Sequence, residues 1–96
     1  MHVRITRAAR NDLLAIGDWL SERHPAAARS TLETLKQRLN MLSQNPEMGR
    51  KRFDIAPELH ALVVRPYLIL YRLEEDTLNV VRIIDGRRDL AKLFGN

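Results

Sequence analysis

Cysteine is absent from the 96-residue sequence, which excludes disulfide bonds and cysteine-ligated zinc. No apolar run approaches the ~20 residues that a membrane-spanning helix needs, and the opening segment MHVRITRAAR lacks the apolar core of a signal peptide. Aromatic residues make up only 5% and there are three histidines, so side chains suited to proton transfer or to stacking on bases are few. These absences predict a soluble, cytoplasmic protein without a metal, a cofactor or a membrane partner.

Positive charge, by contrast, is in excess. Sixteen lysines and arginines against twelve acidic residues give a net charge of +4, and thirteen of the sixteen are arginine. Arginine makes forked, planar contacts with carboxylates and phosphates, so the partner is expected to be acidic: nucleic acid, or a protein with an acidic surface. The basic stretch GRKRF at 49–53 is too short to predict a nucleic-acid-binding domain, so no sequence-specific DNA binding is expected of this chain alone.

The first half of the sequence predicts one strand and two helices. HVRIT alternates between apolar and polar residues, which indicates a short strand. Thr6 can cap a helix that runs to about Arg23, and Pro25 suits the first turn of a second helix that the NPEMG segment ends. Each helix has one apolar stripe, so the two are expected to form an antiparallel hairpin. The stripes are Ala9, Leu13, Ile16 and Leu20, then Ala28, Leu32, Leu35, Leu39 and Leu42.

The second half changes to the period of strands. Residues 50–58 are polar and irregular, and the segments LHALVV, YLILYRL and TLNVVRIID that follow are rich in β-branched and aromatic residues. Short turns at Arg65-Pro66 and at 74–76 join them as hairpins. The sequence therefore predicts a single α+β domain over residues 1–96, with two layers, the order β-α-α-β-β-β, a three-stranded antiparallel meander and a short C-terminal helix or tail.

Two helices can cover only one face of such a sheet. Alternation places Ile69 and Tyr71 towards the helices and leaves an apolar second face that also carries arginines. Either the C-terminal DLAKLF segment folds back over this face, or the face is a groove for another chain, and the two interpretations can hold in different parts of it. The residues assigned to the second face are Leu68, Leu70, Arg72, Val80, Arg82 and Ile84.

The helical hairpin followed by RPYLILYR and VVRIIDGRRDL resembles the ParE/RelE superfamily of bacterial toxin–antitoxin toxins, and within it the ParE branch. The resemblance covers nearly the whole chain. It implies a small cytoplasmic toxin that is neutralised by a ParD-like antitoxin encoded beside it. ParE-type members act on DNA gyrase, whereas RelE-type members cleave mRNA on the ribosome. The residues that carry it are Asp12, Leu13, Ile16, the NPEMG segment, Arg65, Tyr67, Ile69, Tyr71, Arg72, Val81, Arg82, Ile83, Gly86, Arg88 and Asp89.

Cleavage of RNA needs groups that transfer protons as well as groups that stabilise phosphate charge. Arginines can supply the second role, but candidates for the first are scarce. Where many superfamily members have a histidine at the end of the last strand, this chain has Asp85, and leucines and Phe94 stand where the RNA-cleaving branch carries a tyrosine. We therefore interpret the chain as a gyrase inhibitor that works by binding and has no catalytic residue. The alternatives are a ribosome-dependent endoribonuclease and an inactive relative that retains only antitoxin binding.

Two binding surfaces are predicted on this interpretation. The antitoxin is expected to bind the second face of the sheet together with Trp19, which lies one position off its helical stripe and is either a core edge or an interface anchor. Gyrase is expected to contact the charged cluster after the last strand. The alternative is that this cluster forms ion pairs within the chain and stabilises the C-terminal tail. The residues assigned to gyrase are Arg65, Arg87, Arg88 and Asp89.

Overall fold

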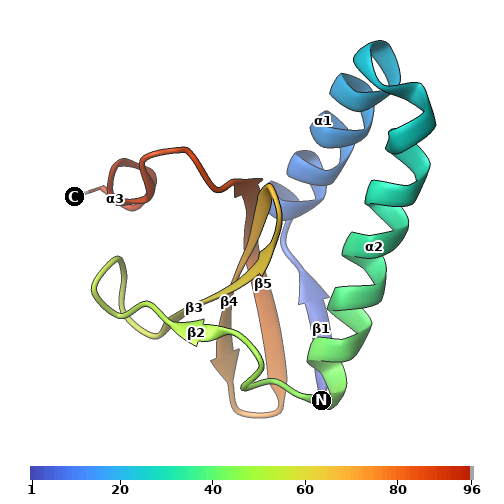
Figure 1. The fold of residues 1–96 in the computed structure, drawn as a ribbon. Helices are drawn as coiled ribbons and strands as arrows, with labels where there is room; N and C mark the ends of the chain where they lie inside the picture. The colour runs from blue at the N-terminus through green and yellow to red at the C-terminus, as the bar shows by residue number, and fades with distance from the viewer. Residues whose placement is uncertain (96) are drawn as a thin grey trace.

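Two long helices and a five-stranded sheet form the layers of the computed structural model, which describes residues 1–95 (Figure 1). The strand order is β1-β5-β4-β3-β2, with β1 parallel to β5 and the other neighbours antiparallel. The expected two-layer α+β fold and its β-α-α-β-β-β order are confirmed, and β2 is an additional short strand in the segment expected to be irregular. The elements are β1 (His2–Ile5), α1 (Arg7–Arg23), α2 (Pro25–Gln44), β2 (Arg50–Lys51), β3 (Leu59–Val64), β4 (Tyr67–Glu74), β5 (Thr77–Asp85) and α3 (Leu90–Leu93).

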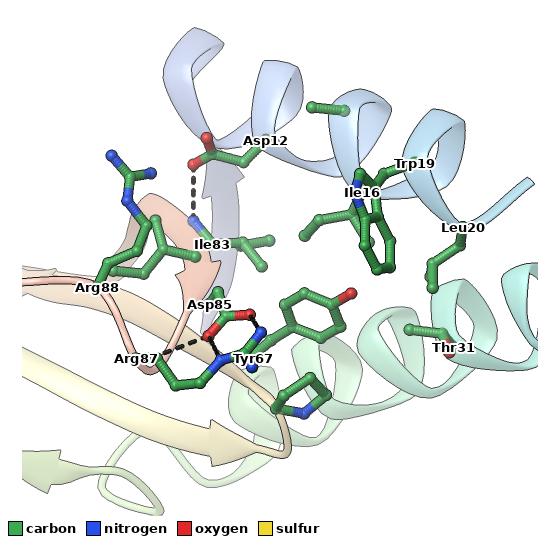
Figure 2. Close-up of a pocket in the computed structure, with 13 residues that line it drawn as sticks. Asp12, Ile16, Trp19, Leu20, Thr31, Tyr67, Ile83, Asp85, Arg87 and Arg88 are labelled. Atoms are coloured by element: carbon green, nitrogen blue, oxygen red, sulfur yellow. Dashed lines mark hydrogen bonds and ion pairs between the residues drawn. The ribbon is translucent and has the colours of Figure 1, made fainter. Parts of the chain in front are cut away.

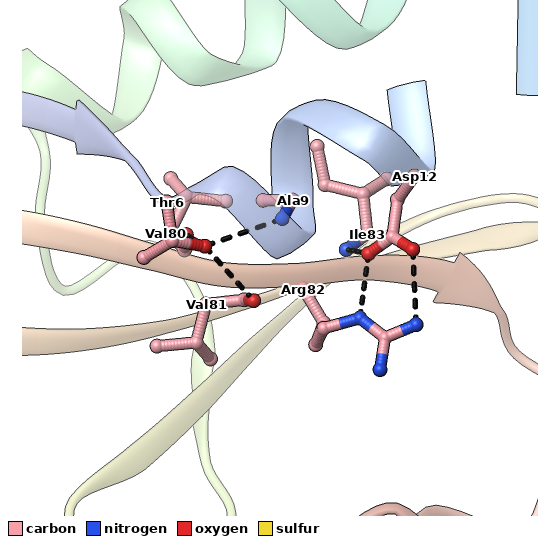
Figure 3. Close-up of polar contacts among 7 residues, drawn as sticks. All are labelled: Thr6, Ala9, Asp12, Val80, Val81, Arg82 and Ile83. Carbon is pink, nitrogen blue, oxygen red and sulfur yellow. Dashed lines mark hydrogen bonds and ion pairs between the residues drawn. The ribbon is translucent and has the colours of Figure 1, made fainter. Parts of the chain in front are cut away.

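The start of α1 is fixed to the sheet by its capping residue. The Thr6 side chain accepts a hydrogen bond from the backbone N–H of Ala9 at 3.2 Å, which satisfies one of the free donors at a helix N-terminus. Its hydroxyl also lies 2.9 Å from the carbonyl oxygen of Val80 in β5 (Figure 3). The same side chain therefore begins the helix and sets its position against the central strands.

The two helical stripes pack on one face of the sheet, as the periodicity predicts. Leu35 and Leu42 of α2 are fully buried in one cluster with Ile69 and Tyr71 of β4. The Tyr71 hydroxyl accepts a hydrogen bond from the Gly49 N–H at 2.9 Å and donates one to the Pro46 carbonyl at 2.8 Å. A side chain on residue 49 has no room, because its Cβ would lie 2.5 Å from that hydroxyl. These two hydrogen bonds of the Tyr71 hydroxyl hold the segment after α2 against the sheet.

Strand β5 contains an irregularity that alternation along the sequence did not predict. Leu70 of β4 pairs with Arg82, whereas Tyr71 pairs with Val80, so Val81 is an extra residue that forms a β-bulge. In the part of β5 that precedes the bulge, each side chain therefore lies on the opposite face from the one that strict alternation from Ile84 predicts. Val80 consequently packs in the cluster beneath the helices, and its assignment to the second face is wrong.

The apolar part of the second face is covered by the chain itself. Leu70 and Ile84 are buried there, with 0% and 3% of their surfaces exposed, and they pack with Ile55 from the segment that follows β2. Leucines of α3 and Phe94 pack against the same cluster, on the side of the sheet away from α1 and α2 (Figure 1). The interpretation that the C-terminal segment folds back is confirmed for this region, and the expectation that Leu70 and Ile84 form an open groove is wrong.

Candidate functional site

A groove of about 550 Å³ opens between α1 and the C-terminal end of β5 (Figure 2). Its walls come from segments that are distant in sequence: α1 from Asp12 to Leu20, Thr31 of α2, the start of β4, the end of β5 and the residues that follow β5. The amphipathic stripe of α1 explains this placement. Two residues of the stripe, Ile16 and Leu20, line the groove together with Ala15 and Trp19, which flank the stripe.

Apolar side chains form the floor and one wall of the groove. Ile83 and Leu20 are buried, with 1% and 7% of their surfaces exposed. Trp19 forms part of the wall contributed by α1 and is 49% exposed (Figure 2). The guanidinium of Arg23 lies 4.8 Å from the centre of its indole, a cation–π contact that holds the ring in place. A half-exposed tryptophan over an apolar floor is typical of protein-binding sites.

The mouth of the groove carries one ion pair and one unpaired arginine. Arg87 donates to the two carboxylate oxygens of Asp85 through Nε at 2.9 Å and Nη2 at 2.7 Å, and its backbone N–H donates to the same carboxylate at 2.9 Å. These hydrogen bonds from Arg87 lower the pKa of Asp85 to about 2. Asp85 is therefore ionised at neutral pH and is unsuited to donate a proton. Arg88 is exposed and makes no ion pair within the described residues 1–95.

Tyr67, at the start of β4, contributes a polar atom to this apolar surface. Only 8% of the residue is exposed, and its hydroxyl makes no hydrogen bond to any residue in the described part of the chain. Burial raises the pKa of Tyr67, and the neighbouring Asp85 carboxylate raises it further. The hydroxyl is therefore protonated at neutral pH and can both donate and accept a hydrogen bond.

A second, smaller depression of about 120 Å³ adjoins the groove. It shares Thr31 and Tyr67 with the larger one, and it is bordered by Arg65. Arg65 is exposed and, like Arg88, has no ion-pair partner among residues 1–95. The two adjoining depressions form one channel, with an arginine beside each part that has no ion-pair partner among residues 1–95. The large part is mainly apolar, whereas the small part is lined by the hydroxyl-bearing residues Ser30, Thr31 and Thr34.

Asp12 lines the groove on the side of β5, and its carboxylate is paired with Arg82. Nε and Nη2 of Arg82 donate to the two oxygens of the Asp12 carboxylate at 2.7 and 2.9 Å, and the Ile83 backbone N–H donates to it at 2.9 Å (Figure 3). The hydrogen bonds with Asp12 raise the pKa of Arg82. The expectation that Arg82 is free to bind a partner's carboxylate is wrong in this structure, since Arg82 ties α1 to β5.

The structure thus regroups the residues that the sequence singled out. Trp19, Arg87 and Arg88 line one groove, although the sequence assigned the first to one partner and the arginines to another. Asp89 caps α3 by accepting from the N–H groups of Ala91 at 3.1 Å and Lys92 at 3.4 Å.

The other residues assigned to the second face are engaged within the chain. Leu68 packs against the cluster beneath α3. Arg72 donates to the Pro57 carbonyl at 3.0 Å and lies 5.8 Å from the centre of the Phe94 ring. Sequence reasoning missed Tyr67 as a site residue. Its alternation with Ile69 and Tyr71 correctly gives its face, but no sequence pattern signals an unpaired hydroxyl.

The lining of the groove is suited to binding and poorly suited to proton transfer. Its two carboxylates, Asp12 and Asp85, are each held by an arginine. His60 lies outside the groove lining, is 4% exposed, and stacks on the Tyr71 ring at 5.2 Å between centres. Within residues 1–95 no group of three or more histidine, aspartate or glutamate side chains is placed to hold a metal ion. No helix in the same range is long and apolar enough to cross a membrane.

Fold and groove together define a small α+β protein whose surface groove offers apolar area and arginines. The chain matches the family described as the ParE toxin of type II toxin–antitoxin systems, parDE, over residues 3–90, and it belongs to that family. Toxin ParE3 of Caulobacter vibrioides is 37% identical to it over 68 residues, which cover 71% of this chain and 68% of that protein.

Other similar proteins carry both branch names. Toxin RelE2 of Caulobacter vibrioides is 36% identical over 77 residues, which cover 80% of this chain and 85% of that protein. A solved chain described as a chromosomal ParDE TA system from P. aeruginosa matches with a TM-score of 0.78 at 24% identity, covering 88% of this chain and 95% of that one. The structural likeness supports the fold.

Proposed function

We propose that this ParE-family toxin acts in the cytoplasm by binding and inhibiting DNA gyrase, and that a ParD-like antitoxin encoded beside it neutralises it. The observation that carries the proposal is the convergence of Trp19, Tyr67 and Arg88 in one groove whose carboxylates are tied up in ion pairs. Tryptophan, tyrosine and arginine are the residues that most often dominate protein–protein binding energy. The site therefore has the chemistry of an interface.

The groove fits a segment of the antitoxin that is both acidic and apolar. Apolar side chains would bury the exposed face of Trp19, and carboxylates would pair with Arg88 and Arg65, which lack partners within residues 1–95. Such a segment can be disordered alone and fold on contact. A segment seated here covers Arg88, which we also assign to the gyrase contact, so neutralisation follows from simple occlusion.

Ribosome-dependent cleavage of mRNA is the second candidate, and the relatives that bear the RelE name favour it. Against it stand the protonation states in the groove. Asp85, with a pKa of about 2, has no proton to give at neutral pH. Tyr67, with a raised pKa, does not lose its proton readily. A general acid and base would each need a pKa near the working pH.

The test is to assay the purified protein side by side for inhibition of gyrase supercoiling and for cleavage of mRNA on programmed ribosomes. Arg88→Glu should weaken gyrase inhibition by at least about tenfold, because charge reversal opposes a complementary acidic surface. Arg29→Glu is the charge-matched control, since the Arg29 side chain is 90% exposed on α2 and does not line the groove. Cleavage of mRNA without inhibition of gyrase would overturn the proposal.

A further inference from the structure

We propose that the Tyr67 hydroxyl is a specificity-determining contact of this groove, and that it selects an antitoxin segment with a polar group placed between its apolar and acidic residues. The inference rests on the proposed function, because it requires that the groove is the antitoxin site. It adds a hydrogen-bonding requirement to a surface that also selects for apolar area and negative charge.

The two tyrosines of the chain show why this hydroxyl is unusual. The Tyr71 hydroxyl is satisfied inside the protein, between the Gly49 N–H and the Pro46 carbonyl. The Tyr67 hydroxyl has no such partner within residues 1–95, although 92% of the residue's surface is buried, the complement of its 8% exposure. It is also absent from the fully buried, unpaired polar atoms of the structure, which belong to His60 and Asn79. The ring is therefore packed, while the hydroxyl itself remains in reach of water.

The position of Tyr67 means that its hydroxyl affects the affinity of any segment that fills the groove. Tyr67 and Thr31 line both the large depression and the small one, so a segment that occupies both must cross Tyr67 (Figure 2). Crossing it removes water from the hydroxyl. A segment with only hydrocarbon at that point leaves a buried polar group unpaired, whereas a segment with a hydrogen-bonding group recovers the lost bond. The penalty on the wrong segment gives specificity.

The charges beside the channel complete the description of the occupant. Arg88 borders the large depression and Arg65 the small one, and neither has an ion-pair partner within the described residues. Thr31 also makes no side-chain hydrogen bond there and lies on the same crossing. The antitoxin segment is therefore expected to present an apolar anchor near Trp19, a polar group over Tyr67 and Thr31, and carboxylates towards the two arginines.

The test compares Tyr67→Phe with Tyr71→Phe, using the purified antitoxin encoded beside this chain as the probe. Calorimetry measures affinity, and circular dichroism measures the melting temperature. Tyr67→Phe should keep the parent's melting temperature and lose about tenfold in affinity, the scale of one buried hydrogen bond. Tyr71→Phe should do the reverse, because it removes two internal hydrogen bonds outside the groove lining. Trp19, the single tryptophan, reports occupancy of the groove by a blue shift of its emission when antitoxin binds.

The outcomes separate this inference from the proposal beneath it. If Tyr67→Phe binds the antitoxin within about twofold of the parent while Trp19→Ala binds it weakly, the role of the hydroxyl is overturned and the groove remains the antitoxin site. Full affinity in both variants, together with an unshifted Trp19 emission, overturns the groove itself. A melting temperature of Tyr67→Phe that falls as far as that of Tyr71→Phe shows an internal partner for the hydroxyl and also overturns the inference.

Discussion

Replacing Asp12 by alanine should destabilise the fold far more than any other loss of a surface carboxylate. The Asp12 carboxylate accepts three hydrogen bonds, two from the Arg82 guanidinium and one from the Ile83 backbone N–H, and it joins α1 to the central strand β5. Only 14% of the Asp12 side chain and 27% of the Arg82 side chain are exposed. In Asp12→Ala the guanidinium stays partly buried without a counterion, and the Ile83 N–H loses its acceptor.

The magnitude follows from those contacts. Breaking a buried ion pair by removing one partner costs about 3–5 kcal/mol, and the residual exposure of Arg82 lowers this to roughly 2–3 kcal/mol through solvent screening. For a domain of this size each kcal/mol shifts the melting temperature by about 4–8 °C, so the variant should melt roughly 10–20 °C below the parent. Thermal unfolding followed by circular dichroism measures the shift.

Asp54→Ala is the matched control. Asp54 makes a similar two-bonded pair with Arg52, at 3.1 and 3.1 Å, but its side chain is 67% exposed. Because water solvates both partners, its loss should leave the melting temperature close to that of the parent. Equal melting temperatures for the two variants would refute the reasoning, since they would show that geometry alone, without burial, decides the contribution of these pairs.

Three further predictions follow from the core and from the charged turn. Leu35→Ala, at a fully buried site, should lower the free energy of unfolding by ~2–5 kcal/mol in urea titrations. The control Leu14→Ala, at a site that is 63% exposed, should change it little, and an equally small change in Leu35→Ala would place α2 outside the core. Leu70→Asp should unfold the protein or lower its melting temperature steeply, because the carboxylate would enter a fully buried position, and a stably folded variant would contradict the packing of the second face. The Asp85 carboxyl should titrate near pH 2 by NMR and at a higher pH in Arg87→Ala, which loses the guanidinium donors but keeps the backbone N–H of residue 87; equal midpoints in the two proteins would contradict the ion pair. Because the pKa of Asp85 is lower in the folded chain than in the unfolded one, its contribution to stability is complete above about pH 4 and is lost as pH falls through 2.

The helices could be predicted from the sequence because their signals are local. The stripe of α2 repeats every three or four residues, Thr6 is a favoured capping residue, and Pro25 fits a first helical turn. Each of these signals depends on neighbours within a few positions. The same holds for the three long strands, which short turns separate.

The faces of β5 on the N-terminal side of the bulge could not be predicted, for a physical reason. Alternation identifies the faces of a strand only when one face is polar, and the NVVRII stretch has apolar residues in adjacent positions. Val80 and Val81 are identical, so nothing local shows that one of them is the extra residue of a bulge. The C-terminal part of the cover over the second face was predicted, but the part from residues 50–58 was hidden, because Ile55 is buried within a segment whose composition is polar.

The groove depends on the topology of the chain as well as on the residue types that the sequence shows. The sequence left Trp19 as either a core edge or an antitoxin anchor and assigned Arg88 to gyrase, so it placed them on different surfaces, with 68 residues between them in the chain. The pairing of β1 beside β5 brings the helix that follows β1 over the end of β5, and both residues line the groove there. Under the proposed function, antitoxin and gyrase then compete for overlapping contacts. A substitution in the groove that weakens the antitoxin also alters the toxin's own target surface, so this chain can change its antitoxin specificity safely only at positions that gyrase does not use.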